Sequence, residues 1–123
     1  MSWVMVAIGG AVGAVARYGV SHAMSRWIGN PVPYATAIVN VAGCAAAGLL
    51  LGAIASGRLP LTLDQRALVF SGVLGGFTTF SGVGLDTLAL VQEGRGLAAA
   101  ANVALQIAAG LAVLAAAYAL ARR

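Results

Sequence analysis

The stretch "GGFTTFSGVGLD", residues 75–86, lies inside an apolar run, between "LVFSGVL" and "TLALV". Glycine raises the entropy cost of fixing a helical backbone, and threonine offers that backbone a competing side-chain hydrogen bond. A Gly-Gly pair followed by Thr-Thr therefore predicts that the third helix of this chain is interrupted between about Gly75 and Ser81.

The composition places this interruption in a membrane. Of the 123 residues, 61% are hydrophobic and 8% are charged, and the mean hydropathy is +0.95. An ordinary soluble domain is far less apolar and carries far more charge. Segments long enough to cross about 30 Å of hydrocarbon occupy residues 3–23, 34–56, 67–91 and 97–120. The chain is predicted to be a single all-α transmembrane domain of four helices, with sequential helices antiparallel because the connections are short.

A helix break at membrane depth has a chemical consequence. Non-helical backbone is tolerated there only where it is buried in protein or lines a water-filled cavity. The first half-helix offers free carbonyl groups, which suit a cation, and the second offers free N–H groups, which favour an anion. Four helices are too few to surround a pore and would expose the break to lipid. We therefore expect an oligomer and no stable monomer.

Polar side chains at membrane depth are costly and often functional. The first two helices contain no carboxylate, which a proton-coupled exporter of cations would need. The site therefore favours an anion, or its polar groups only hold helices together. The dispersed arginines argue against nucleic-acid binding, and we expect no enzyme because the sequence contains no catalytic set. The polar residues concerned are Arg17, Asn40, Thr78, Thr79, Ser81, Asn102 and Gln106.

Small residues recur at a spacing that lets membrane helices approach closely. G-x-x-x-G pairs occur at 9/13, 48/52 and 72/76, although chance is an equal explanation in a chain with 17 glycines. The single cysteine, Cys44, has no partner thiol. It is interpreted as a buried small apolar residue.

The same stretch also carries a family resemblance. "GGFTTFS" at 75–81 resembles the G-G-x-T-T-F-S signature of the CrcB/Fluc family of fluoride channels. Three further stretches match in order: "GAVARY" at 13–18, "PYATAIVNVAG" at 33–43 and "LVQEGR" at 90–95. The resemblance covers essentially the whole chain.

The resemblance implies a subunit with a broken third helix that forms an antiparallel dimer with two narrow fluoride pores. It implies a structural sodium ion at the dimer interface, held by the backbone carbonyls of Gly75 and Thr78, and it places Asp86 where the family often carries glutamate. By the same correspondence Phe80 presents its ring edge to the anion and Asn40 donates a hydrogen bond to it. The implied anion pathway consists of Arg17, Asn40, Thr79, Phe80 and Ser81.

Three positions at which the resemblance implies pore-lining groups depart from the family pattern. Val83 replaces a second pore phenylalanine, and Gly110 and Leu114 stand where many members carry a serine and a threonine. The active form is therefore expected either as a homodimer or as a heterodimer with a homologous chain. The arginines outside the helices favour a fixed orientation if the N-terminus, the second loop and the C-terminus share one side. That side would hold Arg58, Arg66, Arg122 and Arg123, against Arg26 and Arg95.

The expected function is passive export of fluoride across the cell's inner or plasma membrane. Two alternatives stay open at this point. One is a cation-coupled exporter of the small-multidrug-resistance type, and the other is a non-conducting membrane assembly subunit.

Overall fold

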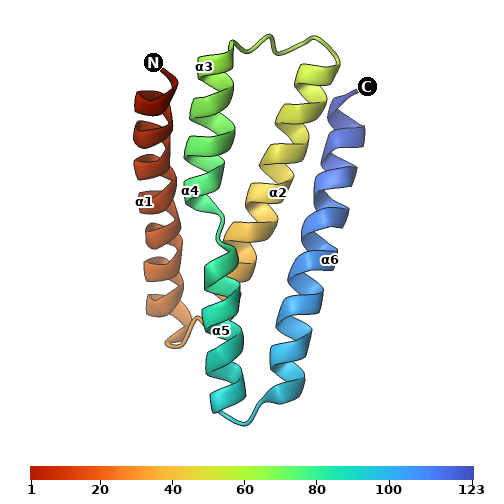
Figure 1. Ribbon diagram of the computed structural model, residues 1–123. Coiled ribbons are helices and arrows are strands. Elements are labelled where there is room, and N and C mark those ends of the chain that lie inside the picture. Colours follow the sequence, from red (N-terminus) through yellow and green to blue (C-terminus); the bar gives the residue numbers. More distant parts are fainter.

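Four long helices form the chain, and the computed structural model describes residues 1–123 (Figure 1). It contains no strand, and all four spans are long and apolar enough to cross a membrane, as predicted. The third span, Leu63–Gln92, is divided into four pieces. The elements are α1 (Ser2–Ile28), α2 (Tyr34–Ala55), α3 (Leu63–Arg66), the π-helix η1 (Ala67–Leu74), α4 (Gly75–Phe77), α5 (Phe80–Gln92) and α6 (Gly96–Ala121).

The ends of two spans differ from the prediction. α1 continues to Ile28 and stops at Gly29, which has φ 80° and donates its N–H to the Ser25 carbonyl. The predicted end at residue 23 is therefore too early, because the helix continues to Gly29, whose positive φ ends it. The third span begins at Leu63, earlier than predicted, because Thr62 and Gln65 form a capping box. The sequence "TLDQ" carries that signal.

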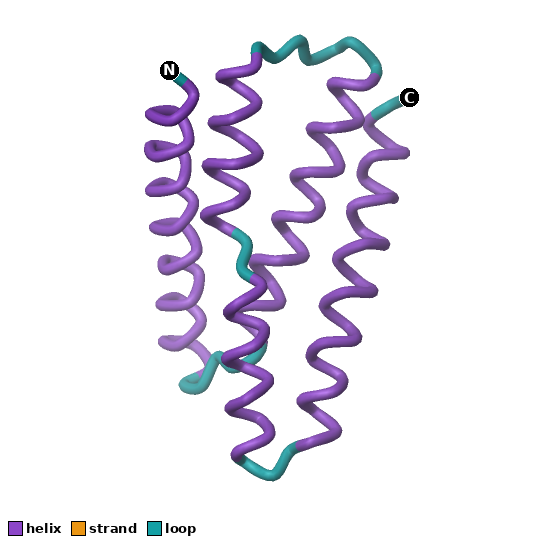
Figure 2. The backbone as a smooth tube through the Cα atoms, viewed as in Figure 1, coloured by secondary structure: helices purple, strands orange, loops and turns teal.

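The predicted interruption of the third span is present and is short (Figure 2). Thr78 and Thr79 are extended, with ψ 158° and 117°, whereas the backbone before and after them is helical. The break lies within the predicted range of Gly75 to Ser81 but is narrower, because Gly75 and Gly76 belong to α4 and Phe80 and Ser81 to α5. The two threonines alone form the break.

The glycines of the G-x-x-x-G pairs lie where neighbouring helices are in contact. A Cβ atom on Gly9 would be 2.5 Å from the Leu68 carbonyl oxygen, and one on Gly76 would be 2.5 Å from the Gly10 carbonyl oxygen. α2 and α6 approach each other equally closely. A Cβ on Gly52 would be 2.6 Å from the Tyr118 carbonyl oxygen. All three G-x-x-x-G pairs are contact positions of this kind, so they pack helices together in this fold.

Gly13 provides a sharp test of this packing. A Cβ there would overlap the Val73 carbonyl oxygen and approach the Phe77 backbone nitrogen to 2.7 Å, whereas a Cβ on Gly19 of the same helix meets nothing within 4 Å. Gly13→Ala is expected to lower the unfolding free energy in detergent by about 1–3 kcal/mol through overpacking. The matched variant Gly19→Ala should be at least as stable as the unchanged chain, because alanine lowers the backbone entropy cost and meets no neighbour there. Equal stability of the two variants would contradict the packing.

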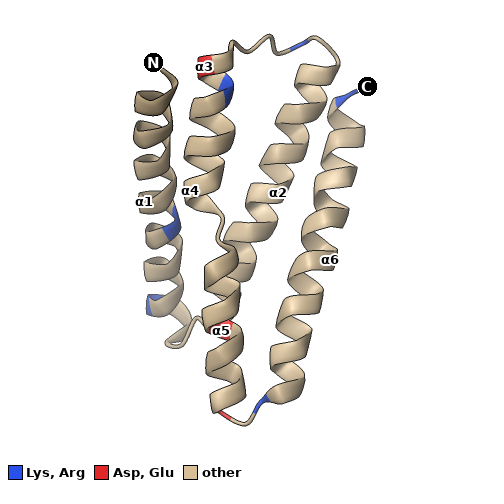
Figure 3. Ribbon diagram, in the orientation of Figure 1, with Lys and Arg blue, Asp and Glu red and all other residues tan.

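Both termini and the loop between α2 and α3 lie at one end of the bundle (Figure 1). The condition set for the arginine asymmetry is therefore met. Figure 3 shows basic residues at both ends of the bundle and an acidic residue on α3, at the end that holds the termini. That end carries four arginines outside the membrane-spanning core, and the opposite end carries Arg26 and Arg95. Arg17 lies between them, within α1.

Candidate functional site

The side chain of Asn40 in α2 forms hydrogen bonds with the backbone at the break in the third span. Its Oδ1 accepts the Thr79 N–H at 2.8 Å, and its Nδ2 donates to the Thr79 carbonyl oxygen at 3.1 Å. In a continuous helix the Thr79 N–H would donate to the Gly75 carbonyl. One asparagine thus satisfies both backbone groups of an extended residue, and it ties α2 to the point where the third span is interrupted.

The second half-helix begins on a side-chain cap. The Thr79 Oγ1 accepts the Gly82 N–H at 2.9 Å and lies 3.1 Å from the Ser81 hydroxyl. A threonine at this position satisfies one of the free N–H groups that begin a helix. The N-terminus of α5 therefore brings the positive end of a helix dipole to the break.

The first half-helix ends on carbonyl groups with different partners. Both the N–H and the hydroxyl of Thr78 donate to the Leu74 carbonyl at 2.9 Å. The Arg17 Nε donates to the Gly76 carbonyl at 3.2 Å. The Gly75 carbonyl loses its usual helical donor because the Thr79 N–H bonds to Asn40. Gly75 is exposed, and with Thr78 it lines a groove of about 250 Å³.

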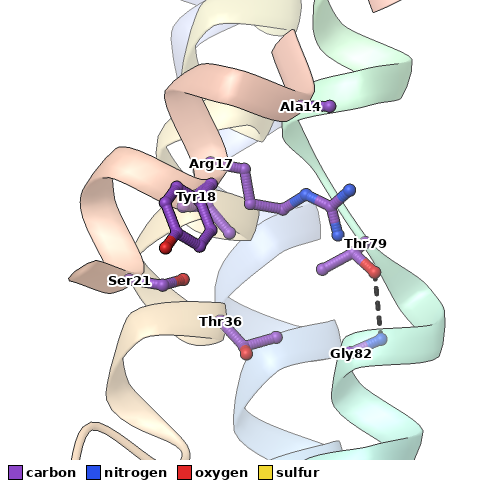
Figure 4. Close-up of a pocket in the computed structure, with 8 residues that line it drawn as sticks. Ala14, Arg17, Tyr18, Ser21, Thr36, Thr79 and Gly82 are labelled. Atoms are coloured by element: carbon purple, nitrogen blue, oxygen red, sulfur yellow. Dashed lines mark hydrogen bonds between the residues drawn. The ribbon is translucent and has the colours of Figure 1, made fainter. Parts of the chain in front are cut away.

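A first polar cavity of about 310 Å³ lies between α1, α2 and the start of α5 (Figure 4). Arg17 extends from α1 toward Thr79, and only its Nε has a hydrogen-bond partner. The remaining guanidinium nitrogens give this cavity a positive charge. Its other lining residues include Tyr18, Ser21 and Thr36.

A second cavity of about 240 Å³ lies on the other side of the break and is lined by Asn40, Thr79, Phe80 and Gln106 among others. Phe80 is 82% exposed in the single subunit. Thr79 lines both cavities, so the Asn40–Thr79 pair stands between them. Cys44 also lines the second cavity and is only half-buried, which corrects its interpretation as a buried apolar residue.

A chain of side-chain amides extends from Asn40 into α6. Asn40 donates to Gln106 at 2.8 Å, and Gln106 donates to Asn102 at 2.8 Å. Asn102 then donates to the Thr87 hydroxyl at 3.1 Å, which donates to the Val83 carbonyl at 2.6 Å. The shared face of Asn102 and Gln106 is visible in the sequence as an i, i+4 pair, but their connection to Asn40 is not. We call these four side chains, Asn40, Gln106, Asn102 and Thr87, the amide relay.

The structure brings most of the predicted site residues together. Arg17, Asn40, Thr78, Thr79 and Phe80 all line the cavities or hold the break. Ser81 is exposed and contacts Thr79 through its hydroxyl.

The remaining positions singled out in the sequence are Asp86 and the three that depart from the family pattern. Val83 is 6% exposed, and a Cβ on Gly110 would lie 3.2 Å from the Cys44 sulfur. Leu114 is half-buried and lines the groove beside Gly75 and Thr78, and Val83 lines the second cavity. Asp86 is half-buried, and its Oδ2 has no hydrogen-bond partner.

The fold and the site define a multi-pass membrane protein in which a discontinuous helix lines polar cavities, an arrangement that transport proteins use to bind ions. A family model described as "CrcB-like protein, Camphor Resistance (CrcB)" matches residues 4–118. The chain belongs to this CrcB-like family.

Relatives of similar length support the assignment. The protein of Rhodospirillum rubrum named "Fluoride-specific ion channel FluC" is 41% identical over 112 residues, which cover 87% of this chain and 84% of the relative. The proteins with the same name from Rhizobium johnstonii and Rhodospirillum centenum are 41% and 48% identical. Those two alignments cover 96% and 80% of this chain, and 97% and 78% of the respective relatives.

Proposed function

We propose that this chain is a subunit of a fluoride-selective channel. The observation that carries the proposal is the break itself: Asn40 and Thr79 separate an arginine-lined cavity from one lined by Phe80 and an amide. The positive charge of Arg17 and the N-terminus of α5 both favour an anion at this point. The names of the relatives supply the identity of the anion.

The channel exports fluoride from the cytoplasm without coupling to another ion. Hydrogen fluoride crosses a membrane as a neutral weak acid and dissociates inside the cell. An inside-negative potential then drives the anion outward by about 2.3 kcal/mol per 100 mV. This action requires the plasma or inner membrane. A cation exporter is disfavoured because neither α1 nor α2 carries a carboxylate.

The working form is a dimer of antiparallel subunits. Phe80 is 82% exposed beside the second cavity, and an open cavity at membrane depth needs protein to cover it. The second subunit is another copy of this chain or a homologous chain with complementary loop charges. Efflux by the purified chain alone distinguishes the two.

A structural sodium ion at the dimer interface fits the residues present. A hard cation prefers oxygen ligands, and the diverted Thr79 N–H leaves the exposed Gly75 carbonyl free to bind one. The Thr78 carbonyl lies in the same break and would complete the set. No cluster of His, Cys, Asp or Glu side chains competes for this role.

Removal of sodium is expected to weaken the dimer. Dimer exchanged into N-methylglucamine chloride of equal ionic strength should dissociate at least tenfold more readily than in sodium chloride, because facing carbonyl groups would then repel each other. Returning sodium should restore it. Analytical ultracentrifugation in detergent measures the dissociation, and an unchanged monomer fraction in both salts would contradict the site.

A fluoride electrode outside liposomes that contain only this chain tests the function. Rapid fluoride release after a potassium ionophore sets the potential is expected, and chloride release should be far slower. Release at the rate of empty liposomes, by the chain alone and with every homologous partner chain of its source, would identify a non-conducting assembly subunit.

A further inference from the structure

The direction of every bond in the amide relay is set by one backbone group. The Thr79 N–H can only donate, so the Asn40 atom that faces it at 2.8 Å must be the oxygen. The amide nitrogen of Asn40 must therefore face Gln106, whose oxygen accepts. By the same logic Gln106 donates to Asn102 and Asn102 donates to Thr87. If any side-chain amide of the relay were rotated by 180°, two donors or two acceptors would face each other.

This fixed direction decides which amide hydrogens are free. Each side-chain amide nitrogen carries two hydrogens. Asn40 uses both, one on the Thr79 carbonyl and one on Gln106. Gln106 uses one, on Asn102, and the other has no acceptor in the subunit. Asn40 is therefore fully bonded, whereas Gln106 retains a free N–H.

The free N–H of Gln106 belongs to the cavity that contains Phe80. The Gln106 side chain is 8% exposed and lines this cavity. Apart from the Cys44 thiol, which is only a weak donor, the other polar side chains of the cavity already have hydrogen-bond partners. The Thr78 hydroxyl donates to Leu74, and the Thr79 hydroxyl caps Gly82 and meets Ser81. A buried donor without a partner is costly, and an anion would satisfy it.

We infer that Gln106, and not Asn40, supplies the amide hydrogen bond to the anion beside Phe80, while Asn40 acts as a clamp on the helix break. The inference rests on the proposed function and assigns a specificity residue within it. A small anion loses its hydration in such a cavity and gains an N–H donor together with the electropositive ring edge of Phe80. Asn102 and Thr87 are positioning residues, because they hold the Gln106 amide in its orientation.

Gln106→Met tests the inference because it keeps the length of the side chain and removes its donor. Fluoride efflux from liposomes is expected to fall at least tenfold, with the dimer preserved. Gln92→Met, at the exposed end of α5, is the matched control and should conduct like the unchanged chain. Asn102→Leu should raise the half-saturating fluoride concentration, which a purely structural loss of active channels would not change.

The unchanged protein gives a second measurement that does not depend on a variant. In its ¹⁵N spectrum in detergent, fluoride should shift the side-chain amide signal of Gln106, chloride should not, and the Asn40 signal should stay in place. A fluoride shift at Asn40 without one at Gln106 would overturn the inference, as would full efflux by Gln106→Met. Absence of efflux and of any fluoride shift in the unchanged chain would instead overturn the proposed function.

Discussion

Replacing Asn40 by leucine is expected to abolish fluoride efflux and to lower the unfolding free energy by about 3 kcal/mol or more. The substitution leaves the N–H and carbonyl of Thr79 without partners and removes the donor to Gln106. Each buried polar group left unsatisfied costs about 1–3 kcal/mol. Denaturant unfolding in detergent and the liposome efflux assay measure the two effects.

Asn102→Leu is the informative comparison for this prediction. Asn102 is also buried and also bonds to Gln106, but it makes no contact with the break itself. It should therefore destabilise the subunit less than Asn40→Leu. An Asn40→Leu protein that unfolds like the unchanged chain and yet fails to conduct would show that Asn40 serves the anion directly and is no clamp.

The position of the break follows from the sequence because its causes are local. Thr78 and Thr79 come together in a stretch where helix continuity is weak, and Thr79 also carries the cap for the next helix. The part that local reasoning missed is the role of Gly75 and Gly76. Gly76 has to be glycine because α1 comes so close that no side chain fits there, and that approach depends on another segment of the chain.

The amide relay could be predicted only in part for the same reason. The pair Asn102 and Gln106 is one helical turn apart, so its shared face is visible in the sequence. The bond from Gln106 to Asn40 joins residues 66 positions apart, and only the packing of α2 on α6 brings them together. Nor did the sequence signal the π-helix η1, because its composition is that of an ordinary apolar helix.

Phe80→Ile is expected to reduce fluoride efflux at least 100-fold without changing the stability of the subunit fold. Phe80 is 82% exposed, so its ring contributes little to packing within one subunit. The ring lines the same cavity as Gln106, and its edge is electropositive. Isoleucine keeps an apolar side chain and removes that edge. Leu85→Ile is the matched control, because Leu85 is 69% exposed on the same helix.

The outcome of Phe80→Ile also bears on which chain completes the pore. Val83 lines the second cavity with an aliphatic side chain, so it offers no second aromatic ring edge, and Phe80 is the aromatic residue that this chain contributes to that cavity. If the chain alone conducts and Phe80→Ile removes conduction, two copies suffice. If conduction appears only with a homologous chain, Phe80→Ile should still abolish it, because the cavity beside Gln106 then forms one wall of a shared pore. Fluoride efflux that is the same with and without the Phe80 ring, in either pairing, would place the anion pathway elsewhere in the molecule.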